Sequence, residues 1–360
     1  MNAPFDSVND QPAILAVATA TPRQRYAQEE IYELACRYSE YYRTPRIKQI
    51  FMNSDIAFRH LYLDAESLPA QETTDELHKR YMAGAVEIGS EAIRKCLRAG
   101  NFDVKEIDYI VAVSCTGYLC PGLSSLLSKE LGLRNNIQRA DLLGMGCAGA
   151  MPGLQRAYDF VKAYPAKKAL LLAVEICSAC YYFDDSLETV VGNAICADGA
   201  AAIVVGSSEG RIVPKIVGFE TFLEPAYIDS VGFEQRNGRL RIILSKDIRD
   251  LAGDLSCTLV NQILQRYDLR KEEVRHWILH SGGRKVIDGV RQALGLTAEQ
   301  ICHSKHVLNN YGNMSSPTVL FVLHEVLHAV NGASAPAAND RGIMLALGPG
   351  LAVEGALLQW

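Results

Sequence analysis

The chain has 360 residues, of which 49% are apolar and 21% are charged, a balance typical of a soluble globular protein with a large core. The formal net charge of −5 and the lack of a dense basic run argue against a nucleic-acid-binding protein. The first ten residues are polar and acidic, which predicts no secretory signal, and no apolar stretch is long enough to span a membrane. We therefore expect a cytoplasmic protein whose ten cysteines are free thiols.

Short apolar runs and amphipathic stretches alternate along the chain, which predicts an α/β fold with sheets covered by helices. The expected buried strands cover residues 13–18, 109–113, 169–174, 200–205, 277–279 and 342–347. The expected helices cover residues 29–40, 74–99, 122–131, 250–267, 284–294 and 318–330.

The order of these elements also suggests two similar halves. Residues 197–206 would end the first half with a strand, and residues 342–360 would end the second half in the same way. We predict an N-terminal half over residues 1–210 and a C-terminal half over residues 211–360. The junction of two halves is a common location for a catalytic cavity.

One cysteine of the first half, Cys147, lies in a segment of small residues, with Gly146 before it and Ala148 and Gly149 after it. A helical pattern over residues 154–164 follows. This arrangement predicts a tight turn near the start of a helix, where backbone N–H groups favour a thiolate over a thiol.

The second half offers two partners for this thiol. His280 precedes a Ser-Gly-Gly segment, and Asn313 lies between Gly312 and a Met-Ser-Ser segment. A protonated histidine nearby lowers the pKa of a thiol, and an amide donates a hydrogen bond to a developing oxyanion. Cysteine, histidine and asparagine in this order suggest acyl transfer through a thioester.

Several motifs together resemble the type III polyketide synthases, the family of chalcone and stilbene synthases and their bacterial relatives. The similar segments are Gly146-Cys147-Ala148-Gly149, Asp198-Gly199-Ala200-Ala201, His280-Ser281-Gly282-Gly283, Gly312-Asn313-Met314-Ser315-Ser316 and residues 347–354. The resemblance implies a thiolase-like fold with five α-β-α-β-α layers, a homodimer, malonyl-CoA and an acyl-CoA starter as substrates, and no metal or organic cofactor.

The same resemblance implies a role for each residue of the triad. Cys147 would be the nucleophile that holds the growing chain, and His280 would keep it ionised and then help to bind the thioester oxygen. Asn313 would be the second donor to that oxygen. The expected reaction is decarboxylative condensation of malonyl-CoA, followed by cyclisation to a resorcinol, phenol or pyrone.

Positions that line the substrate cavity in the family can also be matched to this chain. These positions are Cys115, Thr116, Cys120, Cys196, Phe233, Ile242, Ser315 and Gly350. Many members have a bulky phenylalanine where Cys196 stands, so we expect a wider passage into the cavity and a long or bulky starter. Cys115 is similar to a cysteine of bacterial synthases that use malonyl-CoA alone, and these two indications of the starter conflict.

A basic segment, residues 46–54, resembles the helix of the family that contacts CoA phosphates. Arg46 fits one of its three cationic positions, and Lys48 could replace another from a neighbouring face. A solvated surface helix is an equally good interpretation of this segment.

Other functions stay open at this stage. A ketoacyl synthase III-like enzyme shares the fold and the triad but loads its chains onto an acyl carrier protein. The His324-Glu325-x-x-His328 pattern is typical of zinc peptidases, yet no suitable third ligand follows it. The pair Cys177-x-x-Cys180 lacks a second such pair, so we expect wall or core thiols there. A papain-like protease and a scaffold protein without catalytic activity are two further alternatives.

Overall fold

The computed structural model describes residues 11–64, 72–208, 210–328 and 336–360. Its largest element is a nine-stranded mixed sheet with the order β11-β12-β13-β8-β1-β7-β6-β4-β5. The strands are β1 (Ala13–Ala20), β4 (Ile107–Val113), β5 (Gln138–Leu142), β6 (Lys168–Ile176), β7 (Asp198–Gly206), β8 (Lys215–Leu223), β11 (Val274–Leu279), β12 (Arg341–Gly348) and β13 (Ala352–Gln359).

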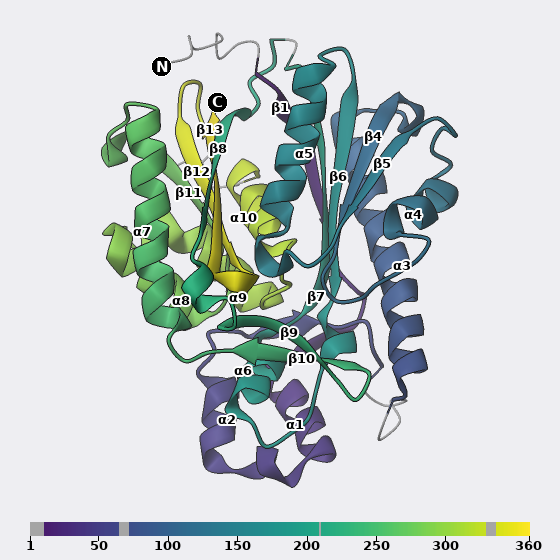
Figure 1. The fold of residues 1–360 in the computed structure, drawn as a ribbon, viewed down its shortest axis with the longest axis vertical. Helices are drawn as coiled ribbons and strands as arrows, with labels where there is room; N and C mark the ends of the chain where they lie inside the picture. Colours follow the sequence, from purple (N-terminus) through teal and green to yellow (C-terminus); the bar gives the residue numbers. More distant parts are fainter. Residues whose placement is uncertain (1–10, 65–71, 209, 329–335) are drawn as a thin grey trace.

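This sheet consists of two half-sheets that meet at a narrow join. Strand β1 pairs with β8 through Ala13 and Lys215, whereas it pairs with β7 along its whole length. The first half-sheet contains β1 and β4 to β7, and the second contains β8 and β11 to β13. The weak join lets the two half-sheets lie in separate layers (Figure 1).

Helices cover both faces of each half-sheet. On the outer face of the first half-sheet lie α3 (Thr74–Gly100) and α4 (Leu123–Leu131), and α7 (Ile248–Arg266) covers the second, with α8 (Arg284–Leu294) packed against α7. Between the half-sheets lie α5 (Ala150–Ala163) and α10 (Thr318–Leu327), which contact strands of both (Figure 1). The order of layers is α-β-α-β-α, which confirms the predicted fold class.

A smaller group of elements closes one end of the layers. It comprises the helices α1 (Gln28–Tyr38), α2 (Pro45–Met52) and α6 (Leu187–Ile195), and the hairpin of β9 (Val231–Arg236) and β10 (Arg239–Leu244). Helix α6 contacts α1, α2 and β10, so this group packs as one unit (Figure 1). Helix α9 (Cys302–Tyr311) precedes α10, and the short strands β2 (Arg25–Ala27) and β3 (Phe58–His60) form a separate ribbon.

All six predicted strands and all six predicted helices are present, with boundaries that differ by a few residues. The end of the last predicted helix, residues 329 and 330, lies outside the described residues. Sequence patterns missed β5, β8, the β9–β10 hairpin, α6 and α9. Strands β5 and β8 keep several residues exposed or half-buried, so they lack the continuous apolar run that marks β6 and β7.

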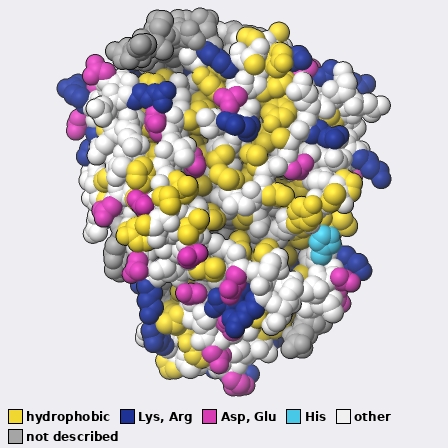
Figure 2. Space-filling model, in the orientation of Figure 1, with side chains coloured by type: hydrophobic (Ala, Val, Ile, Leu, Met, Phe, Trp, Pro, Cys, Tyr) yellow, Lys and Arg dark blue, Asp and Glu magenta, His cyan; other side chains and the backbone are white. Residues whose placement is uncertain are grey.

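The surface carries both charged and apolar side chains. Figure 2 shows apolar side chains gathered over the middle of one face, with acidic and basic side chains scattered around them. Among the described residues, the exposed large apolar side chains include Tyr118, Leu223 and Ile228. None of the helices in the described ranges is long and apolar enough to cross a membrane.

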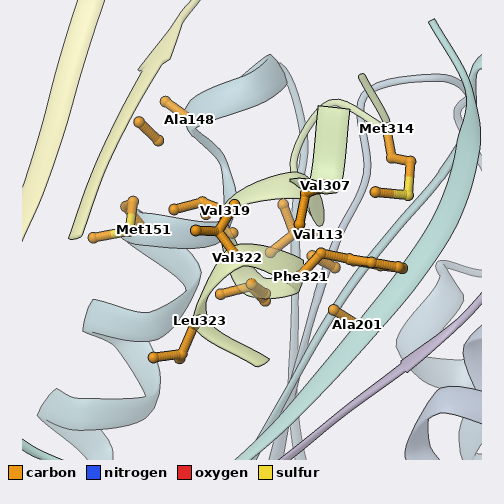
Figure 3. Close-up of a cluster of buried hydrophobic side chains, with 14 of the residues drawn as sticks. Val113, Ala148, Met151, Ala201, Val307, Met314, Val319, Phe321, Val322 and Leu323 are labelled. Carbon is orange, nitrogen blue, oxygen red and sulfur yellow. The ribbon is translucent and has the colours of Figure 1, made fainter. Parts of the chain in front are cut away.

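The central layer contributes apolar side chains to the core from both of its helices. Met151 of α5 lies near Val319 and Val322 of α10, and Phe321 lies beside strands of the first half-sheet (Figure 3). Phe321 is 3% exposed, and its ring packs edge-on against Tyr311 with 5.2 Å between centroids. Because these side chains join both half-sheets, the central layer holds the two sides of the molecule in register.

Replacement of Phe321 by alanine should lower the free energy of unfolding by about 3–5 kcal/mol, because it removes a ring from a packed core and leaves a cavity. Urea denaturation of the purified protein measures this change. Met82→Ala is the matched control, since Met82 is 39% exposed on α3 and its loss should cost about 0.5 kcal/mol or less. Equal losses in the two variants would contradict a stabilising role for the central layer.

Candidate active site

Cys147 lies on a single 3₁₀ turn, Gly146–Ala148, that leads into α5. Gly146 has a φ of +49°, and a Cβ atom at this position would clash with the ring of Pro349. The turn therefore requires glycine both for its conformation and for the close approach of residues 348–350. The predicted turn before a helix is confirmed, and it presents the Cys147 side chain at the N-terminal end of α5.

His280 follows the last residue of β11, and its own N–H donates to the carbonyl oxygen of Leu345 at 2.9 Å, which extends the pairing with β12. The next residue, Ser281, is fully buried and donates its hydroxyl hydrogen to the carbonyl oxygen of Ser304 at 2.7 Å. Ser304 in turn donates to the carbonyl oxygen of Leu279 at 2.9 Å. These bonds hold the His280 segment against α9.

Asn313 lies on the loop between α9 and α10, where it forms an isolated parallel bridge with Cys196. Its N–H donates to the carbonyl oxygen of Ile195, and its own carbonyl oxygen accepts from the N–H of Ala197, both at 2.8 Å. The side-chain oxygen of Asn313 accepts from the N–H of Ser315 at 2.8 Å, and its amide nitrogen donates to the carbonyl oxygen of Gly282 at 3.2 Å. The amide NH₂ group is thereby turned toward the cavity wall that carries His280.

The three predicted catalytic side chains line one cavity. Its empty volume is about 990 Å³, part of which is open to solvent. The side chains of Ser315 and Asn313 are within hydrogen-bonding reach of the Cys147 thiol. His280 and Asn313 are 4% and 6% exposed, whereas Cys147 is half-buried. Tertiary structure thus brings together residues from the two halves of the chain.

Four of the predicted cavity positions are part of the cavity wall. They are Cys196, Phe233, Ile242 and Ser315. Phe233 and Ile242 pair directly across the β9–β10 hairpin. The other wall residues include Cys177, Cys180, Tyr181, Asn193, Ile195, Val231, Leu244, Ile248, Ala252, Val286, Leu347, Pro349 and Leu351.

The other four predicted cavity positions lie elsewhere. Cys115 is adjacent to the site, since its sulfur lies 3.3 Å from the hydroxyl oxygen of Ser315, but it is not part of the cavity wall. Thr116 is buried and its hydroxyl donates to the carboxylate of Glu175 at 2.8 Å. Cys120 is exposed. Gly350 is not part of the cavity wall, although its neighbours Pro349 and Leu351 are. Thr116 and Cys120 miss the wall because the loop after β4 turns the first side chain into the core and the second to solvent.

The sequence analysis missed a buried carboxylate, Glu175, behind the site. Glu175 is fully buried at the end of β6 and accepts hydrogen bonds from the N–H groups of Cys115 and Thr116 at 2.9 and 3.1 Å. The hydroxyl of Ser316 donates to its other oxygen at 2.6 Å. Burial raises the pKa of Glu175, and these donors oppose that effect. One acidic residue inside an otherwise apolar strand is a signal that could have identified it.

Burial disfavours a charge on Cys147 or His280 taken singly. Burial raises the pKa of Cys147 to about 12, although hydrogen bonds from Ser315 and Asn313 act in the opposite direction. It lowers the pKa of His280 to about 4. Each group is therefore neutral near pH 7. Burial thus opposes the resting thiolate that the sequence analysis expected at Cys147. Transfer of the Cys147 proton to His280 would create both charges together without any exchange of protons with solvent.

The predicted CoA-binding residues lie on α2. Arg46 and Lys48 are exposed, whereas Ile47 and Phe51 on the opposite face are buried. Lys48 forms a loose ion pair with Glu29 at 3.5 Å. Helix α2 packs against α6, whose C-terminal end carries Cys196. The structure thus places the two cations on a helix that neighbours the cavity.

The zinc-peptidase pattern lies on α10, away from the triad. His324 and His328 stack with 4.1 Å between ring centroids, and His328 Nδ1 lies 2.9 Å from the carbonyl oxygen of His324. Across the described parts of the chain, no three or more His, Cys, Asp or Glu side chains form a group that could hold a metal ion. The stacked histidines therefore give no support to a peptidase.

Comparisons with known proteins agree with this geometry. The family model described as "Chalcone and stilbene synthases, N-terminal domain" matches residues 6–209, and the C-terminal domain model of the same family matches residues 229–360. A 3,5-dihydroxyphenylacetyl-CoA synthase of Streptomyces toyocaensis is 33% identical, covering 97% of this chain and 90% of its own length. A 1,3,6,8-tetrahydroxynaphthalene synthase of Streptomyces peucetius is 30% identical, with coverages of 97% and 93%.

A solved structure gives the same result for the fold. The crystal structure of PKS-I from the brown alga Ectocarpus siliculosus superposes with a TM-score of 0.91 at 31% identity, covering 97% of this chain and 98% of the other.

Transfer of the Cys147 proton to His280 would give alkylation of Cys147 by iodoacetamide a characteristic dependence on pH. The two groups together would neither gain nor lose a proton between the pKa of about 4 for His280 and the pKa of about 12 for Cys147. The rate should therefore stay nearly constant from about pH 5 to about pH 9, and fall as His280 becomes protonated near pH 4. Mass spectrometry of the Cys147 peptide measures the rate.

His280→Ala is the test of this mechanism. Without the histidine, the Cys147 proton must leave to water, so the alkylation rate should be low at neutral pH and rise about tenfold per pH unit. A wild-type rate that rises with the same slope would show that His280 does not accept the proton.

Proposed function

The chain belongs to the chalcone and stilbene synthase family and is a type III polyketide synthase, an acyltransferase, and from that premise we propose that Cys147, His280 and Asn313 form its catalytic centre. The observation that supports this assignment is that all three side chains line one cavity although they come from distant segments. The proposed substrates are malonyl-CoA and an acyl-CoA starter.

Loading of the starter is the first proposed step. The Cys147 sulfur attacks the carbonyl carbon of the starter thioester as its proton passes to His280, and the thiolate of CoA leaves. The negative oxygen of the tetrahedral intermediate accepts hydrogen bonds from His280 and the amide of Asn313. The N–H of Ser315 holds the side-chain oxygen of Asn313. The amide NH₂ group of Asn313 therefore needs no rearrangement to donate to the negative oxygen of the intermediate.

Extension uses the same donors a second time. Malonyl-CoA loses CO₂, and the enolate oxygen that forms accepts hydrogen bonds from His280 and Asn313. The carbanion carbon then attacks the thioester on Cys147, whose sulfur leaves as a thiolate. The product of this step is a CoA thioester whose acyl chain is longer by two carbons. This acyl group is then transferred from CoA back to the Cys147 sulfur for the next round. A donor pair without a carboxylate suits this step, because a nearby negative charge would oppose the enolate.

Cyclisation is proposed to take place in the apolar part of the cavity. Most of the side chains that line the cavity are apolar, which suits the chain of an uncharged polyketide. Phe233 and Ile242 form one wall, and Cys196, a small side chain, leaves room near the catalytic cysteine. An aromatic resorcinol or phenol, or a pyrone, is the proposed type of product.

Other parts of the assignment are proposals on family grounds. Arg46 and Lys48 are proposed to bind CoA phosphates, and the chain is proposed to act as a cytoplasmic homodimer without a metal or organic cofactor. The exposed apolar side chains of Tyr118, Leu223 and Ile228 are compatible with a protein–protein contact. The division into halves at residue 210 also stays a prediction.

Asn313→Ala should lower kcat for polyketide formation by about 10²–10³-fold, because it removes one donor to the enolate and thioester oxygens. Cys147→Ala should abolish product, since no other group holds the chain. Asn310→Ala is the matched control, because Asn310 is a half-buried residue of the preceding helix that does not line the cavity, and it should keep wild-type kcat. Wild-type turnover by Cys147→Ala would overturn the proposed mechanism.

Incubation with malonyl-CoA, with and without a panel of acyl-CoA starters, should yield a product that mass spectrometry identifies. Product from malonyl-CoA alone would show that the enzyme uses malonyl-CoA as its starter as well. Product that requires an acyl-CoA would define the class of starter. The same assay with malonyl acyl carrier protein tests the ketoacyl synthase III-like alternative. Product that forms only with the carrier protein would contradict the assignment to CoA substrates.

A further inference from the structure

A fully buried cation, Arg59, lies directly behind the cavity wall. Its side chain donates to the side-chain oxygen of Gln28 at 3.0 Å and to the hydroxyl oxygen of Tyr181 at 3.1 Å. It also donates to the carbonyl oxygens of Asn193 and Cys196, each at 2.7 Å. All four acceptors are neutral, and the Nη2 atom has no partner. A buried guanidinium without an anion is costly, so a neighbouring group that can become negative would be stabilised.

Cys196 is a neighbour of this cation that can become an anion inside the wall. Its side chain lines the cavity and is partly accessible, whereas the carboxylate of Asp198 already accepts from Tyr62 and Ser178. A hydrogen bond from the Cys177 thiol, followed by the charge of Arg59, lowers the pKa of Cys196. Burial raises the pKa of Tyr181, which therefore stays a phenol.

Cys177 provides a second thiol at the same place. It lies on the 3₁₀ turn Cys177–Cys180 after β6 and lines the same cavity. The residue before it, Ile176, pairs with Asp198 across β6 and β7, so Cys177 and Cys196 lie where these two strands come together. Two thiols so placed beside a buried cation are the arrangement of an attacking and a resolving cysteine.

We infer that Cys196 and Cys177 form a modification site in the cavity wall, where a hydroperoxide converts the two thiols to a reversible disulfide. The Cys196 thiolate attacks the peroxide oxygen, and with one proton this gives a sulfenic acid and an alcohol, or water from hydrogen peroxide. The Cys177 sulfur then attacks the sulfenic sulfur, its proton leaves with the hydroxyl group as water, and the disulfide forms. The peroxide is reduced by two electrons and the two thiols are oxidised.

The disulfide would affect the catalytic centre through the backbone. Cys196 forms the bridge with Asn313, and Ile195 and Ala197 on either side hold the Asn313 backbone with two hydrogen bonds. A cross-link from Cys196 to the turn after β6 would fix this segment and narrow the wall near Cys147. Oxidation is therefore expected to lower product formation, and a reducing thiol is expected to restore it.

The experiment uses full-length Cys147→Ala protein, so that the proposed nucleophile does not compete for oxidant. The protein is treated with hydrogen peroxide near neutral pH, alkylated and digested without a reductant, and mass spectrometry identifies the linked peptides. We expect a Cys177–Cys196 peptide that dithiothreitol removes. In Cys177→Ser, a sulfenic acid at Cys196 should persist and react with dimedone, about tenfold faster than any reaction at Cys180.

Cys180→Ser is the matched control, because Cys180 lies on the same turn and in the same wall but donates its thiol hydrogen to the carbonyl oxygen of Thr116. It should leave the Cys177–Cys196 peptide unchanged. Absence of that peptide, or an equal yield of Cys180–Cys196 peptide, would overturn the inference.

Activity of the otherwise native enzyme gives a second measurement, with each protein compared with its own untreated rate. Peroxide should lower the activity of the wild type more than that of Cys177→Ser, and dithiothreitol should restore the wild type. Equal losses in both proteins would show that the disulfide does not control the catalytic centre.

Discussion

The active site depends on one short contact between segments far apart in the sequence, the bridge between Cys196 and Asn313. Two backbone hydrogen bonds of 2.8 Å join residues 195 and 197 to Asn313, at the point where the first half of the chain meets the second. Gly312 makes this approach possible, since it has a φ of +71° and a Cβ atom there would lie 2.9 Å from the carbonyl oxygen of Ile195. This contact fixes the backbone of Asn313, and the hydrogen bonds with Ser315 and Gly282 direct its side-chain amide.

Two buried charges support that contact from behind, and neutral groups rather than counter-ions satisfy both. Arg59 donates to carbonyl and hydroxyl oxygens beside Cys196, while Glu175 accepts from N–H and hydroxyl groups beside Cys115 and Ser316. These hydrogen bonds fix the direction of the groups that accept from Arg59 or donate to Glu175, although Arg59 Nη2 has no partner. The thiols that line the cavity nevertheless differ: the hydrogen bond with Cys177, ahead of the charge of Arg59, lowers the pKa of Cys196, whereas burial raises the pKa of Cys147.

Burial determines how the catalytic pair can be ionised. A low dielectric environment disfavours a single charge on Cys147 or on His280, but a proton passed from one to the other keeps the site neutral overall. In the proposed mechanism, the sulfur would lose its proton to His280 as it attacks, so no resting thiolate would be required. This expectation follows from the burial of the two groups and not from the identity of the three residues.

Local patterns were enough to predict the layered α/β fold and the turn that carries Cys147, because these features depend on apolar runs, glycines and short motifs. The same patterns pointed to Cys147, His280 and Asn313 as candidates, and to Cys177 and Cys180 as wall or core thiols, which the cavity wall confirms. The roles of Glu175 and Arg59 could not be predicted, because both lie inside or beside apolar segments and their contacts arise only when β6, α6 and the loop of Asn313 meet. For the same reason Thr116 and Cys120 were misplaced, since the direction of a side chain on a loop depends on long-range hydrogen bonds that no local pattern encodes.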